Sequence, residues 1–427
     1  GINTIFAPVL DINTNPLNPI ISTRAFGEDP ETVSFFGCEM IRILQDNGIA
    51  SCGKHFPGHG DTETDSHISL PLIKKELQLL EKTELVPFRK AIKTGVKMIM
   101  LGHLSVPAID PSGIPASISE KAIRYLRDKM GFNGITITDA LNMGGLAQIT
   151  KATKNVKSLH SPFTKRGRGG IFEIASPEPA LSDKTRFFAR LRRAQNDRIV
   201  IEEEASLMAL RAGVDLLLHP TDPDRVASYL EKTNYYPASS TINRLEVFRR
   251  THCCLAEPVK PHPFFERHKK LSEELARKAI NIKGEMKPMK KPFLILLNDD
   301  EAEKGGILIN VLKSRYPNLR YISFCSQMPV IGSQFRDKIG SQIIVAVFSR
   351  IKAWKGETAP WLKRAIKELE ERAKIFVSFG SPYLFDGIKN DITKIYAYWD
   401  SETVQKAVAE LICLLSNPPL PPFSKGG

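Results

Sequence analysis

Short apolar runs alternate with amphipathic segments along the first part of the chain. The apolar run at 3–11 (NTIFAPVLD) is followed by a segment at 31–48 whose apolar residues recur at helical spacing and which ends in glycine. The same succession links the amphipathic segment at 74–95 to the apolar run at 96–103 (VKMIMLGH). Apolar runs separated by helical segments are typical of βαβ units, so the pattern predicts a parallel β-sheet.

Polar side chains stand near the ends of the predicted strands in this part of the chain. They are Asp11, Lys54, His55, His103 and Asp139. In a (β/α)8 barrel the carboxyl ends of the strands build the active site, so these positions favour a barrel with a polar site. A doubly wound sheet gives a similar alternation, and the pattern alone does not decide between the two folds.

A basic segment at 151–198 interrupts the alternation. It holds twelve Lys and Arg residues against four Asp and Glu, so it carries more than half of the chain's net charge of +13. Such a segment either binds a polyanion or is a disordered surface insertion, and the insertion is the favoured interpretation. Because the rest of the chain is only mildly basic, we expect no nucleic-acid partner.

The α/β pattern resumes after the insertion and then changes character. We assign residues 1–150 and 199–270 to one domain, residues 271–289 to a linker, and residues 290–416 to a separate doubly wound α/β domain. The tail at 417–427 is rich in Pro and Gly and is expected to be disordered.

Composition narrows the class of protein further. The six cysteines form no CxxC pair, which favours free thiols, and no apolar run reaches the roughly 18 residues needed to cross a bilayer. The chain opens without Met and inside an apolar run, so we expect a fragment of a longer, bacterial-type protein. A cytoplasmic and an exported location both stay open, and we expect a monomer.

The motif KHFPGHGDTETDSH concentrates titratable groups in a loop punctuated by Gly and Pro. Asp65 precedes His67 by two residues, a spacing at which a carboxylate can orient an imidazole and raise its basicity for general acid–base catalysis. A zinc site would instead use His55, His59, His67 and a carboxylate. It is disfavoured because HExxH spacing is absent and Lys54 would adjoin the metal. A polar surface loop without chemistry is the third interpretation.

This loop resembles the signature loop of glycoside hydrolase family 3, in its β-N-acetylglucosaminidase branch. The likeness extends in order to FAPVLDINTNP, STRAFGEDPE, GITITDALNMGGL and AGVDLLLHP, and then to VSFGSPYLF and YWDSETVQKAVAEL. It implies a (β/α)8 TIM-type barrel followed by a doubly wound α/β sandwich domain. It also implies that the first barrel strands precede residue 1, so we expect a barrel that is incomplete at its N-terminus.

The resemblance also implies catalytic roles for three residues. Asp139, in the motif ITITDALNM, matches the family's nucleophile, which forms a covalent glycosyl-enzyme in a retaining reaction. His67 matches the general acid/base that this branch carries on a mobile loop, and Asp65 matches the carboxylate that orients it.

Four further residues are expected to bind the sugar. Arg24, Lys54 and His55 match the family's contacts to sugar hydroxyls, for which cationic donors are well suited. His103 is expected to line the same mouth. Neither a metal ion nor an organic cofactor is implied.

The predicted function is that of an exo-acting β-N-acetylhexosaminidase with a carbohydrate substrate. It would remove terminal β-linked N-acetylglucosamine from peptidoglycan fragments or chitooligosaccharides. A β-glucosidase or a glycoside phosphorylase of the same family is one alternative, although the Asp-x-His loop favours the N-acetylglucosaminidase. An inactive truncated product, or a polyanion-binding protein that uses residues 151–198, is the other.

Overall fold

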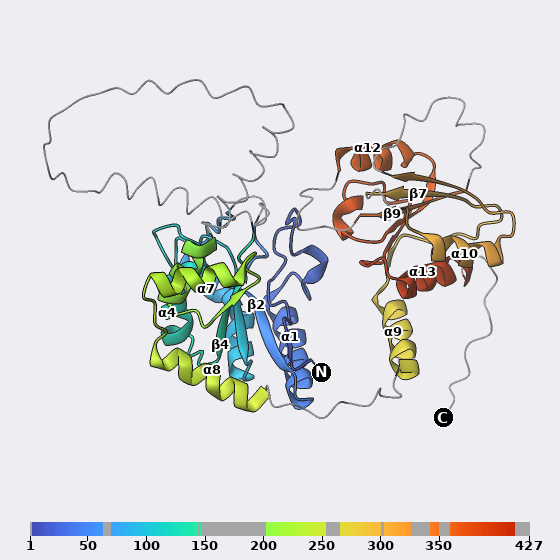
Figure 1. Ribbon diagram of the computed structural model, residues 1–427. Helices are drawn as coiled ribbons and strands as arrows, with labels where there is room; N and C mark the ends of the chain where they lie inside the picture. The colour runs from blue at the N-terminus through green and yellow to red at the C-terminus, as the bar shows by residue number, and fades with distance from the viewer. Residues whose placement is uncertain are drawn as a thin grey trace, which may run out of the picture. The chain divides into compact units, whose positions relative to one another are not determined.

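The computed structural model describes residues 2–62, 70–143, 146, 202–252, 265–299, 303–325, 342–349 and 359–414. These residues belong to two compact units, 1–256 and 257–427 (Figure 1). The segment 151–198 and the tail at 417–427, both expected to be disordered, lie outside the described residues. In the part of the chain that is described, no helix has both the length and the apolar character needed to cross a membrane.

Unit 1 is built on a parallel sheet whose strands are neighbours in the order in which they occur along the chain. The strands are β1 (Thr4–Ile5), β2 (Ala50–Phe56), β3 (Met98–Leu101), β4 (Ile135–Ala140) and β5 (Leu216–Leu218). A doubly wound sheet reverses its strand order, whereas a (β/α)8 barrel keeps it sequential. The sheet is therefore part of a barrel, which confirms the fold predicted for the first domain.

Several helices of unit 1 begin at side chains that cap them. α1 (Pro30–Asp46) and α7 (Pro223–Lys232) each follow an aspartate whose carboxylate accepts a hydrogen bond from a first-turn backbone N–H, and each starts with proline. Ser119 caps α4 (Glu120–Arg124) in the same way. The remaining labelled helical elements are α2 (Leu77–Lys82), α3 (Leu85–Lys93), α8 (Ser239–His252), η1 (Ser22–Arg24), η2 (Ala116–Ile118) and η3 (Tyr125–Lys129).

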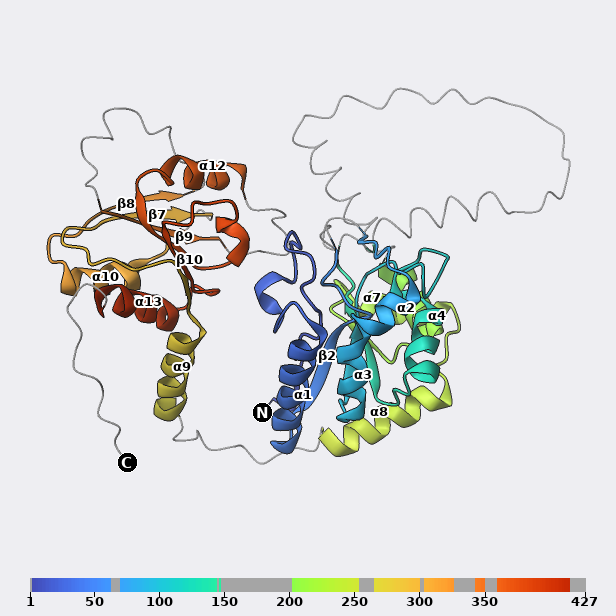
Figure 2. The same cartoon turned by 180° about the vertical axis from the view of Figure 1, so that it is seen from behind.

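The two faces of this sheet pack against different helices. On one face α1 and α3 lie along the strands, and Phe56 and Phe88 belong to the main core that they form with the sheet (Figure 2). On the other face Met98 and Met100 pack with Phe248 of α8. Successive residues of β3 thus serve opposite faces, as the alternation of side chains along a strand requires.

A buried group of charges joins α8 to the sheet. Asp215, which directly precedes β5, has a fully buried side chain that contacts Arg244 of α8 at 2.6 Å and Arg127 of η3 at 2.7 Å. Thr136, near the start of β4, donates both its backbone N–H and its hydroxyl to Asp215 at 2.9 Å. Asp215 therefore holds α8 near the amino ends of β4 and β5.

Unit 2 contains a six-stranded sheet in the order β6–β11–β10–β9–β7–β8. All strands are parallel except β6, which runs antiparallel to β11 at one edge. From β7 the chain passes to β8 on one side and then to β9 on the other, which is the order of a doubly wound sheet. The strands are β6 (Asn281–Lys283), β7 (Phe293–Asn298), β8 (Arg320–Cys325), β9 (Ile343–Phe348), β10 (Ala373–Ser378) and β11 (Thr393–Tyr396).

Helices cover both faces of the second sheet. α10 (Gly306–Arg315) and α13 (Glu402–Leu414) pack on the face that carries Leu294 and Leu296. α12 (Pro360–Leu369) packs on the face that carries Ile295 and Val345. Figure 1 shows the sheet between these helices, and this three-layer arrangement confirms the doubly wound domain predicted for the C-terminal part.

The beginning of unit 2 differs from the boundary expected at residue 290. Helix α9 (Phe265–Ala279) lies against α13, where Arg277 contacts Glu410 and Glu273 contacts Lys406, each pair at 3.1 Å. Strand β6 then pairs with β11. The segment 271–289, interpreted from its sequence as a linker, thus contributes part of a helix and an edge strand to this unit. Its surface is mostly polar, which is why its pattern resembles a connector.

Candidate active site

The predicted site residues of unit 1 gather at the carboxyl ends of neighbouring strands. Asp139 is the last but one residue of β4, and His55 is the last but one of β2. His103 follows β3 by two residues. Because β2, β3 and β4 are adjacent and parallel, these ends meet at one edge of the sheet. This is the edge at which barrel enzymes carry their active sites.

Asp139 is a half-buried carboxylate in a positive environment. Its Oδ1 accepts a hydrogen bond from the N–H of Ala140 at 2.8 Å. Burial raises the pKa of Asp139, but interaction with the imidazoles of His55 and His103 and the hydrogen bond from Ala140 lower it, and the net pKa lies below its ordinary value. The carboxylate is therefore ionised at neutral pH, the state that a nucleophile requires.

His103 lies beside Asp139 but has both ring nitrogens engaged within the protein. Its Nδ1 is 2.7 Å from the hydroxyl of Ser117, and its Nε2 is 3.0 Å from the carbonyl oxygen of Ala140. A carbonyl oxygen can only accept, so Nε2 carries the proton. The fully buried ring thus anchors the peptide that follows Asp139. This placement favours a positioning role over the predicted contact to substrate.

Asp11 organises the centre of the site. Its carboxylate is 0% exposed and accepts three hydrogen bonds: one oxygen takes the backbone N–H groups of His55 at 3.0 Å and His59 at 2.8 Å, and the other lies 2.7 Å from His55 Nδ1. Burial raises the pKa of Asp11, but interaction with His55 lowers it more, to about 2. In the sequence, only its position at the end of a predicted strand points to Asp11. Its role as hydrogen-bond acceptor depends on residues more than forty positions away.

The contact with Asp11 determines how His55 presents its other ring nitrogen. An ionised carboxylate only accepts hydrogen bonds, so Nδ1 of His55 carries a proton. Nε2 lies 3.4 Å from the guanidinium Nη2 of Arg24, which can only donate. His55 is therefore read as the neutral Nδ1–H tautomer, with Nε2 accepting from Arg24. The structure thus brings the exposed Arg24 and the buried His55 into contact.

Lys54 completes the cationic side of the site. It is half-buried in β2, and burial, followed by the charge of Arg24, lowers its pKa, while the charges of Asp139 and Asp11 act in the opposite direction. Arg24 and Asp139 thus both act electrostatically on Lys54. The structure accordingly brings four predicted residues into one cluster: Arg24, Lys54, His55 and Asp139.

The first part of the Gly-rich loop packs tightly against the chain that follows β1. Gly60 lies so close to this segment that a Cβ atom there would stand 1.6 Å from the carbonyl oxygen of Ile12. Asn18 donates to the carbonyl of His59 at 2.8 Å. His59 itself is buried, and burial, followed by the interaction with His55, lowers its pKa to about 4, so the ring is neutral at pH 7.

The second part of the loop contains both residues predicted for acid–base catalysis. His67 and Asp65 lie outside the described residues, and their predicted roles stay predictions. The alternative zinc site also requires His67 and is equally untested. Within the described ranges, no three or more His, Cys, Asp and Glu side chains are grouped as metal ligands.

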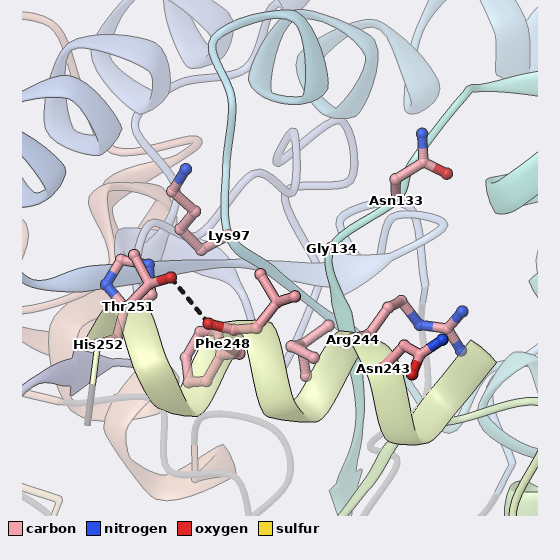
Figure 3. A pocket seen from close by; sticks show the side chains of 10 residues that line it. Lys97, Asn133, Gly134, Asn243, Arg244, Phe248, Thr251 and His252 are labelled. Atoms are coloured by element: carbon pink, nitrogen blue, oxygen red, sulfur yellow. Dashed lines mark hydrogen bonds between the residues drawn. The ribbon is translucent and has the colours of Figure 1, made fainter. Parts of the chain in front are cut away.

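A separate cavity of about 340 Å³ lies at the opposite ends of the strands. It is lined by Lys97 and Gly134, which directly precede β3 and β4, and by Arg244, Phe248 and His252 of α8 (Figure 3). Because its lining comes from the amino ends of the strands, it shares no residue with the site at their carboxyl ends.

Fold and site together define unit 1 as part of a (β/α)8 barrel with an ionised aspartate among cationic side chains at its carboxyl edge. Residues 1–161 match the model of the glycosyl hydrolase family 3 N terminal domain. This match confirms the family resemblance of the motifs in that part of the chain.

Curated relatives match the same part of the chain. Beta-hexosaminidase A of Pseudoalteromonas piscicida is 40% identical over 159 residues, which cover 34% of this chain and 27% of that protein. A protein of Cellulomonas fimi named beta-N-acetylglucosaminidase/beta-glucosidase is 37% identical over 166 residues, which cover 36% of this chain and 29% of that protein. The chain thus matches less than a third of the length of either relative.

Solved structures share the fold over nearly the whole chain. A glycoside hydrolase family 3 beta-N-acetylglucosaminidase from a Paenibacillus species aligns with a TM-score of 0.71 and 23% identity, covering 97% of this chain and 74% of that chain. A beta-glucoside phosphorylase aligns with a TM-score of 0.72 and 18% identity, covering 98% and 73%. At these identities the likeness concerns the fold alone.

Proposed function

We propose that the protein acts as a retaining exo-β-N-acetylglucosaminidase. The observation that carries the proposal is the ionised Asp139 at the carboxyl edge of the barrel, clustered with Lys54, His55 and Arg24 inside the segment that matches family 3. The names of the curated relatives, beta-hexosaminidase and beta-N-acetylglucosaminidase/beta-glucosidase, support the substrate class.

The proposed reaction has two steps. Asp139 attacks the anomeric carbon and forms a covalent glycosyl ester, while the protonated His67 gives its proton to the departing oxygen of the aglycone. His67, now neutral and oriented by Asp65, takes a proton from a water molecule that attacks the same carbon. The ester bond breaks, Asp139 is restored as a carboxylate, and His67 is protonated again.

Two residues of the cluster would bind the sugar before the reaction, and a third would orient one of them. Arg24 and Lys54 offer N–H donors to hydroxyl oxygens, and the fixed tautomer of His55 accepts from Arg24 at Nε2 and so orients its guanidinium. The natural substrate would be a peptidoglycan fragment or a chitooligosaccharide with a terminal β-linked N-acetylglucosamine. A β-glucosidase activity is the second candidate, favoured by the double name of the Cellulomonas fimi relative. A phosphorylase activity stays the alternative given by the sequence, and added phosphate tests it.

The test compares aryl β-N-acetylglucosaminide with aryl β-glucoside, each with and without inorganic phosphate. We expect turnover of the N-acetylglucosaminide without phosphate, and a loss of about 10⁴-fold or more in kcat for Asp139→Ala. Asp110→Asn is the matched control, because Asp110 is a buried carboxylate of the same unit that bonds to Ser119 and Ser112. Faster turnover of the glucoside would favour the second candidate. Full activity of Asp139→Ala would exclude Asp139 as the nucleophile.

A further inference from the structure

Unit 2 contains a cavity of about 400 Å³ at the edge of its sheet. The cavity lies between strands β6 and β11 and the turn that follows η4 (Pro382–Phe385). Its ionisable lining consists of the ammonium groups of Lys283, Lys389 and Lys394, the carboxylate of Asp386 and the phenol of Tyr396. A cavity of this volume is within the range of small-molecule sites, and its lining has an excess of positive charge.

Lys394 is the unusual member of this lining. It is only 7% exposed in the middle of β11, and its ammonium donates a hydrogen bond to the carbonyl of Ile388 at 2.6 Å. Across the described parts of unit 2, no carboxylate lies within ion-pair distance of this ammonium. Burying a cation without a counter-ion is unfavourable, and one carbonyl satisfies only one of its three N–H donors.

Lys283 adds a second positive charge directly beside the first. In the antiparallel pairing of β6 with β11, Lys283 is the residue opposite Lys394. Like charges in opposite positions of neighbouring strands destabilise the pair. The ammonium of Lys283 lies 5.5 Å from the ring centroid of Tyr396, on the same face of the sheet as the cavity lining.

The remaining charges of the cavity do not neutralise this pair. Lys389 forms an ion pair with Glu371, which is not part of the lining. Asp386 supplies one carboxylate against three lysines. The buried Lys394 and the exposed Lys283 opposite it thus have no carboxylate partner among the described residues of unit 2.

We propose that this cavity binds the anionic group, phosphate or carboxylate, of a small organic molecule. The anion would lie between Lys394 and Lys283 and accept hydrogen bonds from both ammonium groups. The site belongs to unit 2 and is independent of the glycosidase activity proposed for unit 1, so either proposal can fail without the other.

Calorimetric titration of the full chain with inorganic phosphate, and separately with acetate, tests the site at constant ionic strength. We expect saturable binding of at least one anion, and the tighter of the two identifies the class of ligand. Lys394→Met should weaken that binding by about tenfold or more. In the absence of the anion the same variant should melt at an equal or higher temperature than the wild type, since it lacks the unpaired buried charge.

Three further variants distinguish anion binding in this cavity from anion binding elsewhere on the chain. Lys374→Met, at an exposed position on the neighbouring strand β10, should keep wild-type affinity. Arg24→Ala should also keep wild-type affinity. If the anion bound at the cationic site of unit 1 instead, this variant would lose the binding. If Lys394→Met does not fold, Lys283→Gln decides, and it should weaken binding. Absence of saturable binding in the wild type, or unchanged affinity in the foldable lysine variants of the cavity, overturns the proposal.

Discussion

At the scale of single residues, the candidate site depends on the number of hydrogen bonds that Asp11 can accept. Three N–H groups converge on its carboxylate, and they come from the backbone of His55 and His59 and from the His55 ring. An amide has one accepting oxygen and one donating NH₂ group in place of the two oxygens. A change from carboxylate to amide at this position therefore alters the protonation pattern of the ring without changing the volume of the side chain.

For Asp11→Asn we expect the amide oxygen to keep the two backbone N–H groups while the NH₂ group faces Nδ1 of His55. The ring proton then moves to Nε2, where it opposes the N–H groups of Arg24. Loss of this hydrogen bond should raise KM for the aryl N-acetylglucosaminide roughly tenfold, in line with one lost charge-assisted hydrogen bond. Long-range ¹⁵N NMR of histidine-labelled protein reports the tautomer directly.

The control for this substitution is again Asp110→Asn. It removes a buried carboxylate of unit 1 and should lower stability, but it leaves the His55 tautomer and KM unchanged. A His55 ring that keeps its Nδ1 proton in Asp11→Asn would contradict the predicted relay from Asp11 to Arg24. The ¹⁵N signal is independent of turnover, so it remains informative if the enzymatic proposal fails.

At the scale of elements, Asp215 is the residue that connects a helix to the sheet. It lies in the motif AGVDLLLHP, directly before the apolar run that forms β5. The structure pairs it with Arg244 and Arg127 and with Thr136 at the amino ends of the strands. Its role is therefore to fix α8 under the sheet.

We expect Asp215→Ala to destabilise unit 1 by roughly 3–5 kcal/mol, because two partly buried arginines lose their common counter-ion. Urea denaturation measures the loss, and hydrogen exchange of β4 amides assigns it to unit 1. Arg225→Ala is the control, since the Arg225–Glu203 pair is more exposed and should contribute within about 1 kcal/mol. Equal effects of the two substitutions would show that the buried group is not the main attachment of α8.

The strands of unit 1 show how much of the structure could be predicted from the sequence. The apolar runs predict β2, β3 and β4, because a buried strand appears in the sequence as a run of consecutive apolar residues. They also place Lys54, His55 and Asp139 at the carboxyl ends of these strands. Asp11 as the centre of the site and His103 as an anchor of Ala140 could not be predicted. Their roles depend on contacts between elements that are separated by more than thirty residues.

At the scale of the whole molecule, strand order distinguishes two sheets that have the same local pattern. Both units alternate strands and helices, yet unit 1 keeps its strands in sequential order and unit 2 reverses them at β7. Periodicity contains no information on which strand lies next to which, so the distinction came only from the family resemblance and from the pairing itself. Strand order matters for function, since it decides which polar strand ends meet.

The stereochemistry of the reaction tests the proposed assembly of the whole site. An inverting glycosidase needs a second carboxylate that activates water, whereas a retaining enzyme of the proposed kind needs only one nucleophilic carboxylate and a separate acid/base. Asp11, the other carboxylate of the described cluster, is fully buried and already accepts three N–H bonds, so it is not free to activate water. We therefore expect ¹H NMR to detect the β-anomer of N-acetylglucosamine as the first product, with the α-anomer appearing only at the rate of mutarotation measured in the same buffer. Initial release of the α-anomer would mean that Asp139 acts as a base toward water rather than as a nucleophile.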